Sequence, residues 1–368
     1  MTSKIRVGLV GVGNNASAMV QGVYYYSDAD GADAAANGRE GIRFPALCGY
    51  KISDIEFSSA FDVDARKVGL DLGQAIFSEP NRYPHVLADA PLTGVVVQGA
   101  PVLDGVPIFL AEMVEVAAES SVGQAADLFD TCVRSVRESN TEVLVNFLPS
   151  GSDQATEFFA RVAAHGGAAY VNCTPSPAAH SPEILKLFEK VRLPLLGDDL
   201  ESQFGSSLLH RTLLNALQER GLEIVHSYQI NLGGNADFKN LSHRSEAKKR
   251  SKQKAISTVG LADRIDILPS GGFISGLGDN KVGYMVIEGR GWLNMPVTID
   301  LKLKVQDSSN AIGVTVDLVR LARGARDRQL SGYVPLSYYF KNPLGNKLAT
   351  EQALAVVEQF DRGESIDV

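Results

Sequence analysis

The stretch at residues 4–16, KIRVGLVGVGNNA, decides the fold. Its first half, KIRVGLV, is short, apolar and rich in β-branched residues, which is typical of a buried parallel strand. Gly11 and Gly13 follow at once in a GxGxxA pattern, and helical character continues over residues 17–23. In this context Gly11 permits a tight turn and Gly13 lets the backbone approach a pyrophosphate at the helix N-terminus. The alternative is a tight turn that binds no ligand. The predicted cofactor contacts here are Gly11, Gly13, Asn14 and Asn15.

An acid closes the second predicted strand, which covers residues 55–61 and ends in Asp62-Val-Asp64. A carboxylate at this point binds the hydroxyls of an adenosine ribose and repels a 2′-phosphate, so Asp62 predicts NAD as the cofactor. Asp62 comes later than the usual spacing of about 20 residues after the glycines. The intervening residues 24–52 are rich in Gly, Asp and Ala, and we predict an inserted loop there.

Strands and helices alternate through the first half of the chain. Further strands are predicted at 94–98, 141–148, 168–172 and 193–196, with helices that include 124–138 and 154–165. Such alternation specifies an α/β fold with a doubly wound parallel sheet.

The pattern changes after residue 197. A helix is predicted at 202–219 and a strand at 222–232, and strands at 282–288 and 297–305 alternate as in an antiparallel sheet with one covered face. Amphipathic helices at 310–323 and 351–360 complete the chain. We predict that residues 1–196 and 307–368 form a Rossmann-type domain and that residues 197–306 form an inserted α+β domain.

A basic cluster at residues 244–254 stands out because the whole chain is acidic, with a formal net charge of -8. Lys248 and Lys252 are four residues apart, which places both on one face of a helix, and Ser251 lies beside them. Such a face suits a phosphorylated small molecule, and a solvated basic helix is the alternative.

Composition excludes several classes of protein. The 368 residues suffice for two domains, no apolar run approaches the roughly 20 residues of a membrane span, and no signal peptide is expected. The acidic balance disfavours nucleic acid as a partner. Cys48, Cys132 and Cys173 are far apart and form no CxxC pair, and the histidines form no metal-binding motif. We therefore expect no metal site and a reducing cytoplasm.

Motifs along nearly the whole chain resemble those of the bacterial and archaeal myo-inositol-1-phosphate synthases. They are GVGNNAS at 11–17, AFDVDARKVG at 60–69, FLPSGSDQAT at 147–156, GDDLESQFG at 197–205, LGGNADFKNL at 232–241, KKRSK at 248–252, LGDNK at 277–281, QDSSNAIGV at 306–314 and YYFKNP at 338–343. The resemblance implies NAD as cofactor, a hexose phosphate as substrate, and an inserted domain that holds catalytic lysines and assembles a homotetramer.

The chemistry that the resemblance implies is a cyclisation without net redox. The C5 hydroxyl of a hexose 6-phosphate is oxidised to a ketone, the C6 enolate attacks the C1 aldehyde, and the C5 ketone is then reduced again. Cations are needed at the phosphate and at both developing oxyanions, in a site closed to water. Lysines suit these positions because a partly desolvated lysine exchanges protons near neutral pH.

Motif positions assign the roles. Lys281 in LGDNK is expected to transfer a proton at the C5 oxygen. Lys248 and Lys252 are expected at the aldehyde oxygen and at the phosphate or enolate, and Lys341 reaches the same pocket. The acids expected to orient the lysines are Asp237 and Asp307, although Asp307 could also cap the following helix. Asp199 or Asp198 is expected near the nicotinamide. The remaining predicted cofactor contacts are Asp198, Ser150 and Gly151.

The chain departs from the family pattern at four places. Glu201 replaces a lysine, and the segments QGAPVLDG at 98–105, NCTPSPAA at 172–179 and QDSSNAIG at 306–313 also differ. We expect the exchange at Glu201 and the segment at 306–313 to alter the substrate pocket. D-glucose 6-phosphate is the first-choice substrate, and D-fructose 6-phosphate, closing a five-membered ring, is the alternative. The rival classes are an NAD-dependent sugar dehydrogenase and a nucleotide-sensing or RNA-binding protein.

Overall fold

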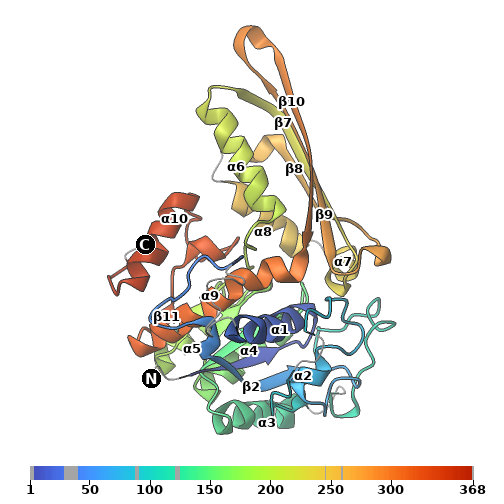
Figure 1. The fold of residues 1–368 in the computed structure, drawn as a ribbon, viewed down its shortest axis with the longest axis vertical. Helices are drawn as coiled ribbons and strands as arrows, with labels where there is room; N and C mark the ends of the chain where they lie inside the picture. The colour runs from blue at the N-terminus through green and yellow to red at the C-terminus, as the bar shows by residue number, and fades with distance from the viewer. Residues whose placement is uncertain are drawn as a thin grey trace.

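The chain folds around two β-sheets, a larger parallel one and a smaller one that stands over it (Figure 1). The computed structural model describes residues 4–28, 40–87, 91–120, 125–244, 246–257 and 260–366. Part of the loop predicted at 24–52 lies outside the described residues. The predicted α/β class with a parallel sheet is confirmed.

The larger sheet has the order β11-β6-β5-β4-β1-β2-β3, and all its neighbouring strands are parallel. Its strands are β1 (Ile5–Val10), β2 (Ile55–Asp62), β3 (Val97–Gly99), β4 (Val143–Asn146), β5 (Ala169–Asn172), β6 (Pro194–Leu196) and β11 (Gly332–Tyr333). The chain proceeds from β1 to one edge through β2 and β3, and to the other edge through β4, β5 and β6. The strand order therefore reverses between β1 and β4, and in such sheets ligands bind beyond the carboxyl ends of the strands at this point.

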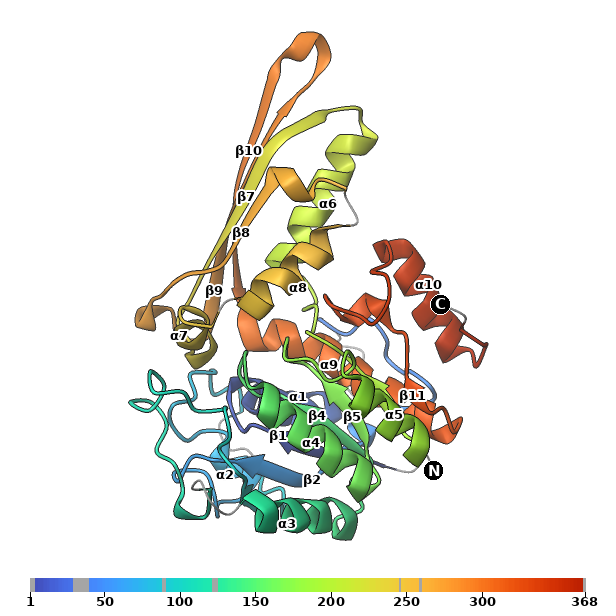
Figure 2. The ribbon, with the colours of Figure 1, turned by 180° about the vertical axis from the view of Figure 1, so that it is seen from behind.

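Helices cover both faces of this sheet, as in a doubly wound fold. On one face α1 (Asn14–Asp28) packs beside α9 (Asp307–Asp327) in a core with the apolar side chains of β1 and β4 (Figure 1). The other face is covered by α3 (Ala125–Glu138), α4 (Asp153–Gly166) and α5 (Pro182–Val191) (Figure 2). The Ser181 hydroxyl caps α5, and Gly167 ends α4 in the left-handed conformation. Short α2 (Leu72–Ala75) and C-terminal α10 (Thr350–Asp361) complete these layers.

The smaller sheet has the order β10-β9-β7-β8, with strands β7 (Glu223–Gly233), β8 (Ile265–Phe273), β9 (Asn280–Arg290) and β10 (Pro296–Gln306). On one face α6 (Ser206–Glu219) and α8 (Glu246–Ser257) bury an apolar core with residues such as Leu214, Ile256 and Ile287. Short α7 (Ala236–Leu241) follows β7. The expected antiparallel pairing of β9 and β10 is confirmed.

Two of the described strands, β8 and the two-residue β11, were not predicted, and some bounds differ from those expected. β8 was not predicted, because its Pro269 and paired glycines at 271–272 are poor strand formers, and it runs parallel to β7. The predicted helix at 202–219 begins only at Ser206, because residues 203–204 instead exchange hydrogen bonds with Asn310 of α9. The proposed division at residues 197 and 306 remains a prediction.

Candidate active site

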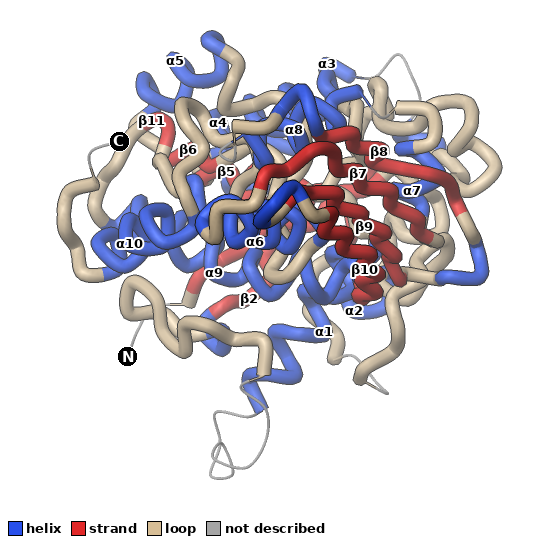
Figure 3. The backbone as a smooth tube through the Cα atoms, turned by 90° about the horizontal axis from the view of Figure 1, so that it is seen from above, coloured by secondary structure: helices blue, strands red, loops and turns tan. Residues whose placement is uncertain are grey.

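A cavity of about 280 Å³ lies where the carboxyl ends of the parallel strands meet the smaller sheet, which projects over them (Figure 3). It brings together the glycine turn and all four predicted lysines. Its lining includes Gly11, Gly13, Asn14, Asn15, Asp62, Ser150, Asp237, Lys248, Lys252, Lys281, Asp307 and Lys341. Two stretches of the sequence more than 200 residues apart therefore share one site.

The glycine turn has room for a ligand. Gly11 has φ +84°, and its N–H donates to the carbonyl of Phe61 at 2.9 Å, which ties the turn to β2. A Cβ atom at Gly13 would meet no atom within 4 Å, and Gly13 lines the cavity. The first turn of α1 begins here, and its N–H groups have no intrahelical acceptors. This geometry fits a pyrophosphate group.

Asp62 organises the turn as well as lining the cavity. One carboxylate oxygen accepts the Val12 N–H at 2.7 Å, and the other accepts the N–H groups of residues 63 and 64. Asn14 also has two roles. It lines the cavity, and its side-chain oxygen accepts the N–H of Arg82 at 2.6 Å, which holds the loop at Arg82 against the turn.

Lys67 also lines the cavity, and the sequence analysis missed it. It is buried, and its ammonium group donates to the Val12 carbonyl at 2.9 Å and to Asn81 at 3.0 Å. Lys67 belongs to the motif AFDVDARKVG, and its place in that motif was the feature of the sequence that could have indicated a role in the site.

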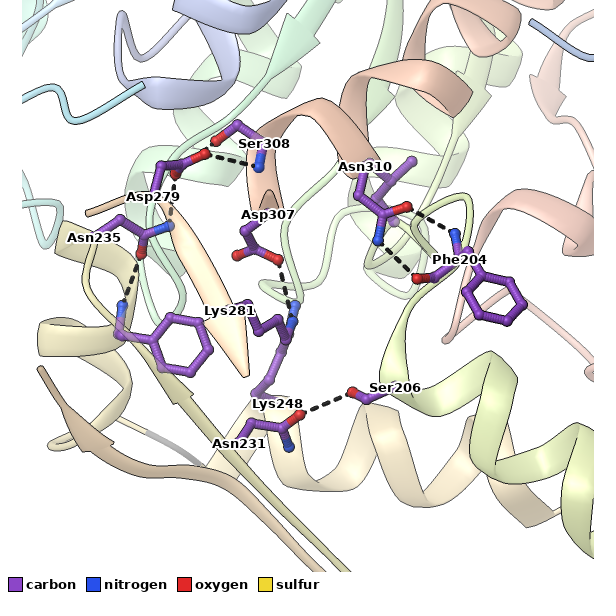
Figure 4. Close-up of polar contacts among 12 residues, drawn as sticks. Phe204, Ser206, Asn231, Asn235, Lys248, Asp279, Lys281, Asp307, Ser308 and Asn310 are labelled. Atoms are coloured by element: carbon purple, nitrogen blue, oxygen red, sulfur yellow. Dashed lines mark hydrogen bonds and ion pairs between the residues drawn. The ribbon is translucent and has the colours of Figure 1, made fainter. Parts of the chain in front are cut away.

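The lysines come from three separate segments and meet two carboxylates. Asp199 accepts from Lys248 of α8 at 2.7 Å and from Lys341 at 3.3 Å. Lys281, near the start of β9, donates to Asp307 at the start of α9 at 3.3 Å (Figure 4). Asp199 itself is completely buried behind the lysines and does not line the cavity.

Burial and the neighbouring charges shift the pKa values of three of the lysines differently. Burial, reinforced by the charges of Lys281, Lys341 and Lys248, holds the pKa of Lys252 well below that of a free lysine. Its Nζ lies 2.8 Å from the amide oxygen of Gln229 when that amide is oriented to satisfy its neighbours. Lys252 is therefore the lysine of the group in which burial and like charges favour the neutral form.

Lys341 and Lys248 differ from Lys252 because each faces a carboxylate. Burial lowers the pKa of Lys341 to about 8, and Asp199 partly opposes that effect. Burial also acts on Lys248, but Asp199 and Asp237 outweigh it and raise the pKa of this lysine. Despite its burial, Asp199 has a pKa far below the usual range because two ammonium groups face it. The carboxylates thus favour the charged form of Lys248, while the pKa of Lys341 is about 8.

Asp237 and Ser150 form a second polar wall. The Ser150 hydroxyl donates to Asp237 at 3.4 Å, and its carbonyl accepts from the Asn240 amide at 2.7 Å. Burial raises the pKa of Asp237, Lys248 opposes this and Asp307 adds to it. Gly151 does not line the cavity; its φ is +80°, and a Cβ there would lie 2.9 Å from the Arg244 side chain. The structure thus gives Gly151 a packing role beside Arg244.

Asp198 lies away from the cavity, and Asp279 has a role for which no expectation was stated. Asp198 does not line the cavity, because its carboxylate accepts from Asn172 at 2.7 Å, from the backbone at 178–179 and from His180. Asp279 was quoted only within LGDNK, yet it caps α9 by accepting the N–H of Ser308 at 3.1 Å and its hydroxyl at 2.9 Å. The cap thus comes from Asp279 and leaves Asp307 facing Lys281 (Figure 4).

Three of the four departures from the family pattern line the cavity. The segment 98–105 contributes residues 100–102 and 105, the segment 172–179 contributes residues 173–175, and the segment 306–313 contributes Asp307, Ser308 and Ala311. Glu201 lies elsewhere: it is buried against Arg211 and Lys347. Glu201 is therefore not part of the cavity lining, and its effect on the substrate pocket remains a prediction.

Within the part of the chain that the structure describes, no group of His, Cys, Asp and Glu side chains is arranged to hold a metal ion. None of the helices described is long and apolar enough to cross a membrane.

The fold is of the Rossmann type, and one cavity holds both a glycine turn of the nucleotide-binding type and a cluster of buried and half-buried lysines. These features define the class as an enzyme with a two-part active site. Residues 205–308 match the family model of myo-inositol-1-phosphate synthase. The chain is 38% identical over 372 residues to the inositol-3-phosphate synthase of Mycolicibacterium smegmatis, with 98% of each chain covered. It is 37% identical to that of Mycobacterium tuberculosis, covering 98% of this chain and 96% of the relative.

Solved structures agree. The crystal structure of Ari2 superposes with a TM-score of 0.81 and 38% identity, covering 98% of this chain and 99% of the other. A myo-inositol-1-phosphate synthase-related protein from Thermotoga maritima, 23% identical, has the same fold with a TM-score of 0.78 and covers 99% of this chain and 100% of its own. The chain belongs to the inositol-3-phosphate synthase family, as its motifs predicted, and it is an enzyme.

Proposed function

We propose that this enzyme is an NAD-dependent cyclitol-phosphate synthase that converts D-glucose 6-phosphate to myo-inositol 1-phosphate. The observation that supports it is the single cavity in which a glycine turn faces four lysines. NAD bound there would take a hydride from C5 and later return it, so the overall reaction is an isomerisation. Gly11, Gly13 and Asn15 would surround the pyrophosphate, and Asp62 would face the ribose.

The lysines divide the proton transfers among themselves according to their charges. In its amine form Lys281 takes the proton of the C5 hydroxyl, Asp307 holds the ammonium group that results, and the proton is returned at the end. Lys252, whose pKa is lowered by burial and by its lysine neighbours, is suited to accept the C6 proton once the C5 ketone has acidified it. The ammonium of Lys248 is held by Asp199 and faces Asp237, and it stabilises the phosphate or the enolate oxygen.

Lys341 completes the cation set at the aldehyde oxygen. It needs its proton there, because the oxygen becomes an alkoxide as the ring closes. Its pKa of about 8 makes that proton easy to give to the new hydroxyl group.

D-fructose 6-phosphate is the second candidate, since three altered segments line the cavity. Closure on its C2 ketone would form a five-membered ring and leave a C1 hydroxymethyl group to accommodate. The test is kcat/KM for both sugars on one preparation, with the product ring identified by NMR. A cyclase needs only catalytic NAD, whereas stoichiometric release of NADH would show a sugar dehydrogenase and overturn the proposal.

We also propose that the enzyme is a cytoplasmic homotetramer assembled through the smaller sheet. The hairpin between β9 and β10 exposes Trp292 to 87%, and Leu293 and Met295 beside it are also exposed. Exposed apolar surface of this kind marks interaction sites. Light scattering of the full chain would measure the assembly, and a monomeric mass at micromolar concentration would refute it.

A further inference from the structure

Three buried charges form a cluster outside the active-site cavity. The Glu201 carboxylate accepts from Arg211 at 2.9 Å on one oxygen and from Lys347 at 2.5 Å on the other. None of the three side chains is exposed by more than 6%. Two cations around one buried carboxylate are costly to desolvate, so such a cluster needs further hydrogen bonds.

Those further bonds lead to the segments that present the lysines. Arg211 of α6 also donates at 2.9 Å to the carbonyl of Ala255 in α8, the helix that presents Lys248 and Lys252. Lys347 donates at 2.7 Å each to the carbonyls of Ser337 and Phe340, which are four residues and one residue before Lys341. Glu201 is therefore the anion between two lysine-bearing segments that are about 90 residues apart in the sequence.

Backbone hydrogen bonds also join the segment of Glu201 to the segment that carries Lys341. The Glu201 N–H donates to the carbonyl of Tyr339 at 2.7 Å, and the N–H of Lys341 donates to the carbonyl of Asp199 at 2.7 Å. Lys341 Nζ also donates to the carbonyl of Leu200 at 2.5 Å. Asp199, which binds Lys248 and Lys341, is thus only two residues from Glu201, and a shift of Glu201 would move both lysines.

We propose that Glu201 is a positioning residue that fixes Lys341 relative to Lys248 and Lys252 through Arg211 and Lys347. The proposal rests on the proposed function for the meaning of turnover, but the geometry of the cluster does not depend on the substrate. A lysine at position 201, as in the family pattern, would place three cations together in this buried cluster. The chain therefore uses a different local arrangement to hold the same catalytic lysines.

Glu201 acts on Lys341 through its charge as well as through the hydrogen bonds that set its position. The Glu201 carboxylate raises the pKa of Lys341, against the lowering caused by burial. Glu201→Gln keeps the shape and removes the charge. It is expected to lower the pKa of Lys341 because an anion that favours the charged form is lost. A change in pKa at a residue that Glu201 does not touch is a readout that lost stability alone would not produce.

The experiment compares Glu201→Gln with Glu142→Gln. Glu142 pairs with Arg323 and accepts the Arg6 N–H at 3.0 Å at the amino-terminal side of the parallel sheet, away from the cavity. Both variants lose one carboxylate from an ion pair, so they match in chemistry. Turnover is measured with hexose phosphate and NAD. The pKa of Lys341 is measured without substrate, by pH-dependent acetylation with acetic anhydride and mass spectrometry.

Glu201→Gln is expected to lower kcat by about 10- to 100-fold with little change in KM, since misplacement near 1 Å has this scale of effect. Its Lys341 labelling midpoint should fall below the value of about 8 expected for the unmodified chain. Glu142→Gln should change neither. Unchanged kcat and an unchanged midpoint in Glu201→Gln would overturn the proposal, even if its melting temperature fell.

Two further outcomes are separable. If the unmodified enzyme cyclises no hexose phosphate, the proposed function fails, and the labelling midpoint alone decides the role of Glu201. If Glu201→Gln does not fold, Lys347→Met decides instead, since it leaves the Glu201–Arg211 pair intact and frees the carbonyls of Ser337 and Phe340. Normal kcat in that variant would overturn the proposal.

Discussion

The two halves of the cavity are built in opposite ways. The glycine turn is continuous in sequence, from β1 into α1, and presents mainly backbone N–H groups. The lysine half is assembled from α8, the start of β9 and the segment around Lys341, and presents charged side chains. The first half depends on backbone conformation and the second on the placement of individual charges. Damage to the first should weaken cofactor binding, and damage to the second should slow the reaction.

The largest expected effect is in the lysine half. Lys281→Ala removes the group that exchanges a proton at C5, so turnover should fall by about 10²-fold or more, the scale for losing a general acid–base group. Affinity for NAD should stay within about threefold, because the glycine turn is untouched. Steady-state kinetics and a fluorescence titration with NAD measure the two quantities.

Lys304→Ala is the matched control, since Lys304 is an exposed lysine of β10, the neighbouring strand. It should keep normal turnover. Near-normal turnover in Lys281→Ala would remove Lys281 from the proposed mechanism and with it the division of labour between the two halves.

The complementary change is in the glycine turn. Asp62→Ala removes the acceptor of the Val12 N–H and the carboxylate facing the ribose. Hydrogen bonds to charged groups contribute roughly 1.5–3 kcal/mol, so NAD should bind about 10- to 100-fold more weakly. At saturating NAD, kcat should recover most of its normal value, unlike in Lys281→Ala. Discrimination against NADP should also decrease, and equal use of NAD and NADP by the unmodified enzyme would contradict the role of Asp62.

The same contrast explains what the sequence could predict. The glycine turn, β2 and Asp62 follow from local patterns, and the structure brings them to the predicted place. That Lys248 and Lys252 share a face follows from helical spacing. The meeting of these lysines with Lys281 and Lys341 required the family resemblance, because no local rule relates segments that are so far apart. No local pattern shows that Asp198 and Glu201 lie outside the cavity lining, because their partners Asn172 and Lys347 are 26 and 146 residues away.

A pH profile tests the lysine half without mutating its chemistry. If Lys341 acts as an ammonium group, kcat should fall above pH 8 and approach a tenfold loss per unit, because its pKa is about 8. An alkaline limb that begins only above pH 10 would exclude this role.

The stability of the protein should change in the opposite direction over the same pH range. The folded pKa of Lys341, about 8, lies below the value of 10.5 for a free lysine. Between these values the unfolded chain binds more protons at this residue, so its contribution to the free energy of unfolding rises with pH. Urea unfolding of the unmodified chain and of Lys341→Met at pH 7 and pH 10 isolates the term, and the difference between the two proteins should favour the unmodified chain more at pH 10.

The smallest effect on turnover is expected at Asp279, which caps the helix that begins with Asp307. Asp279 accepts the N–H and the hydroxyl of Ser308, and so it caps α9 and leaves Asp307 directed at Lys281. Loss of a helix cap costs about 0.5–2 kcal/mol, so Asp279→Ala should lower the free energy of unfolding by that amount. Part of this cost appears as disorder of Asp307, and kcat should fall by less than in Lys281→Ala. Asp279→Asn should recover much of the stability, because an amide oxygen still accepts from Ser308. A loss of kcat in Asp279→Ala as large as that in Lys281→Ala would mean that Asp279 takes part in the chemistry, and the lysine half would extend beyond the residues that line the cavity.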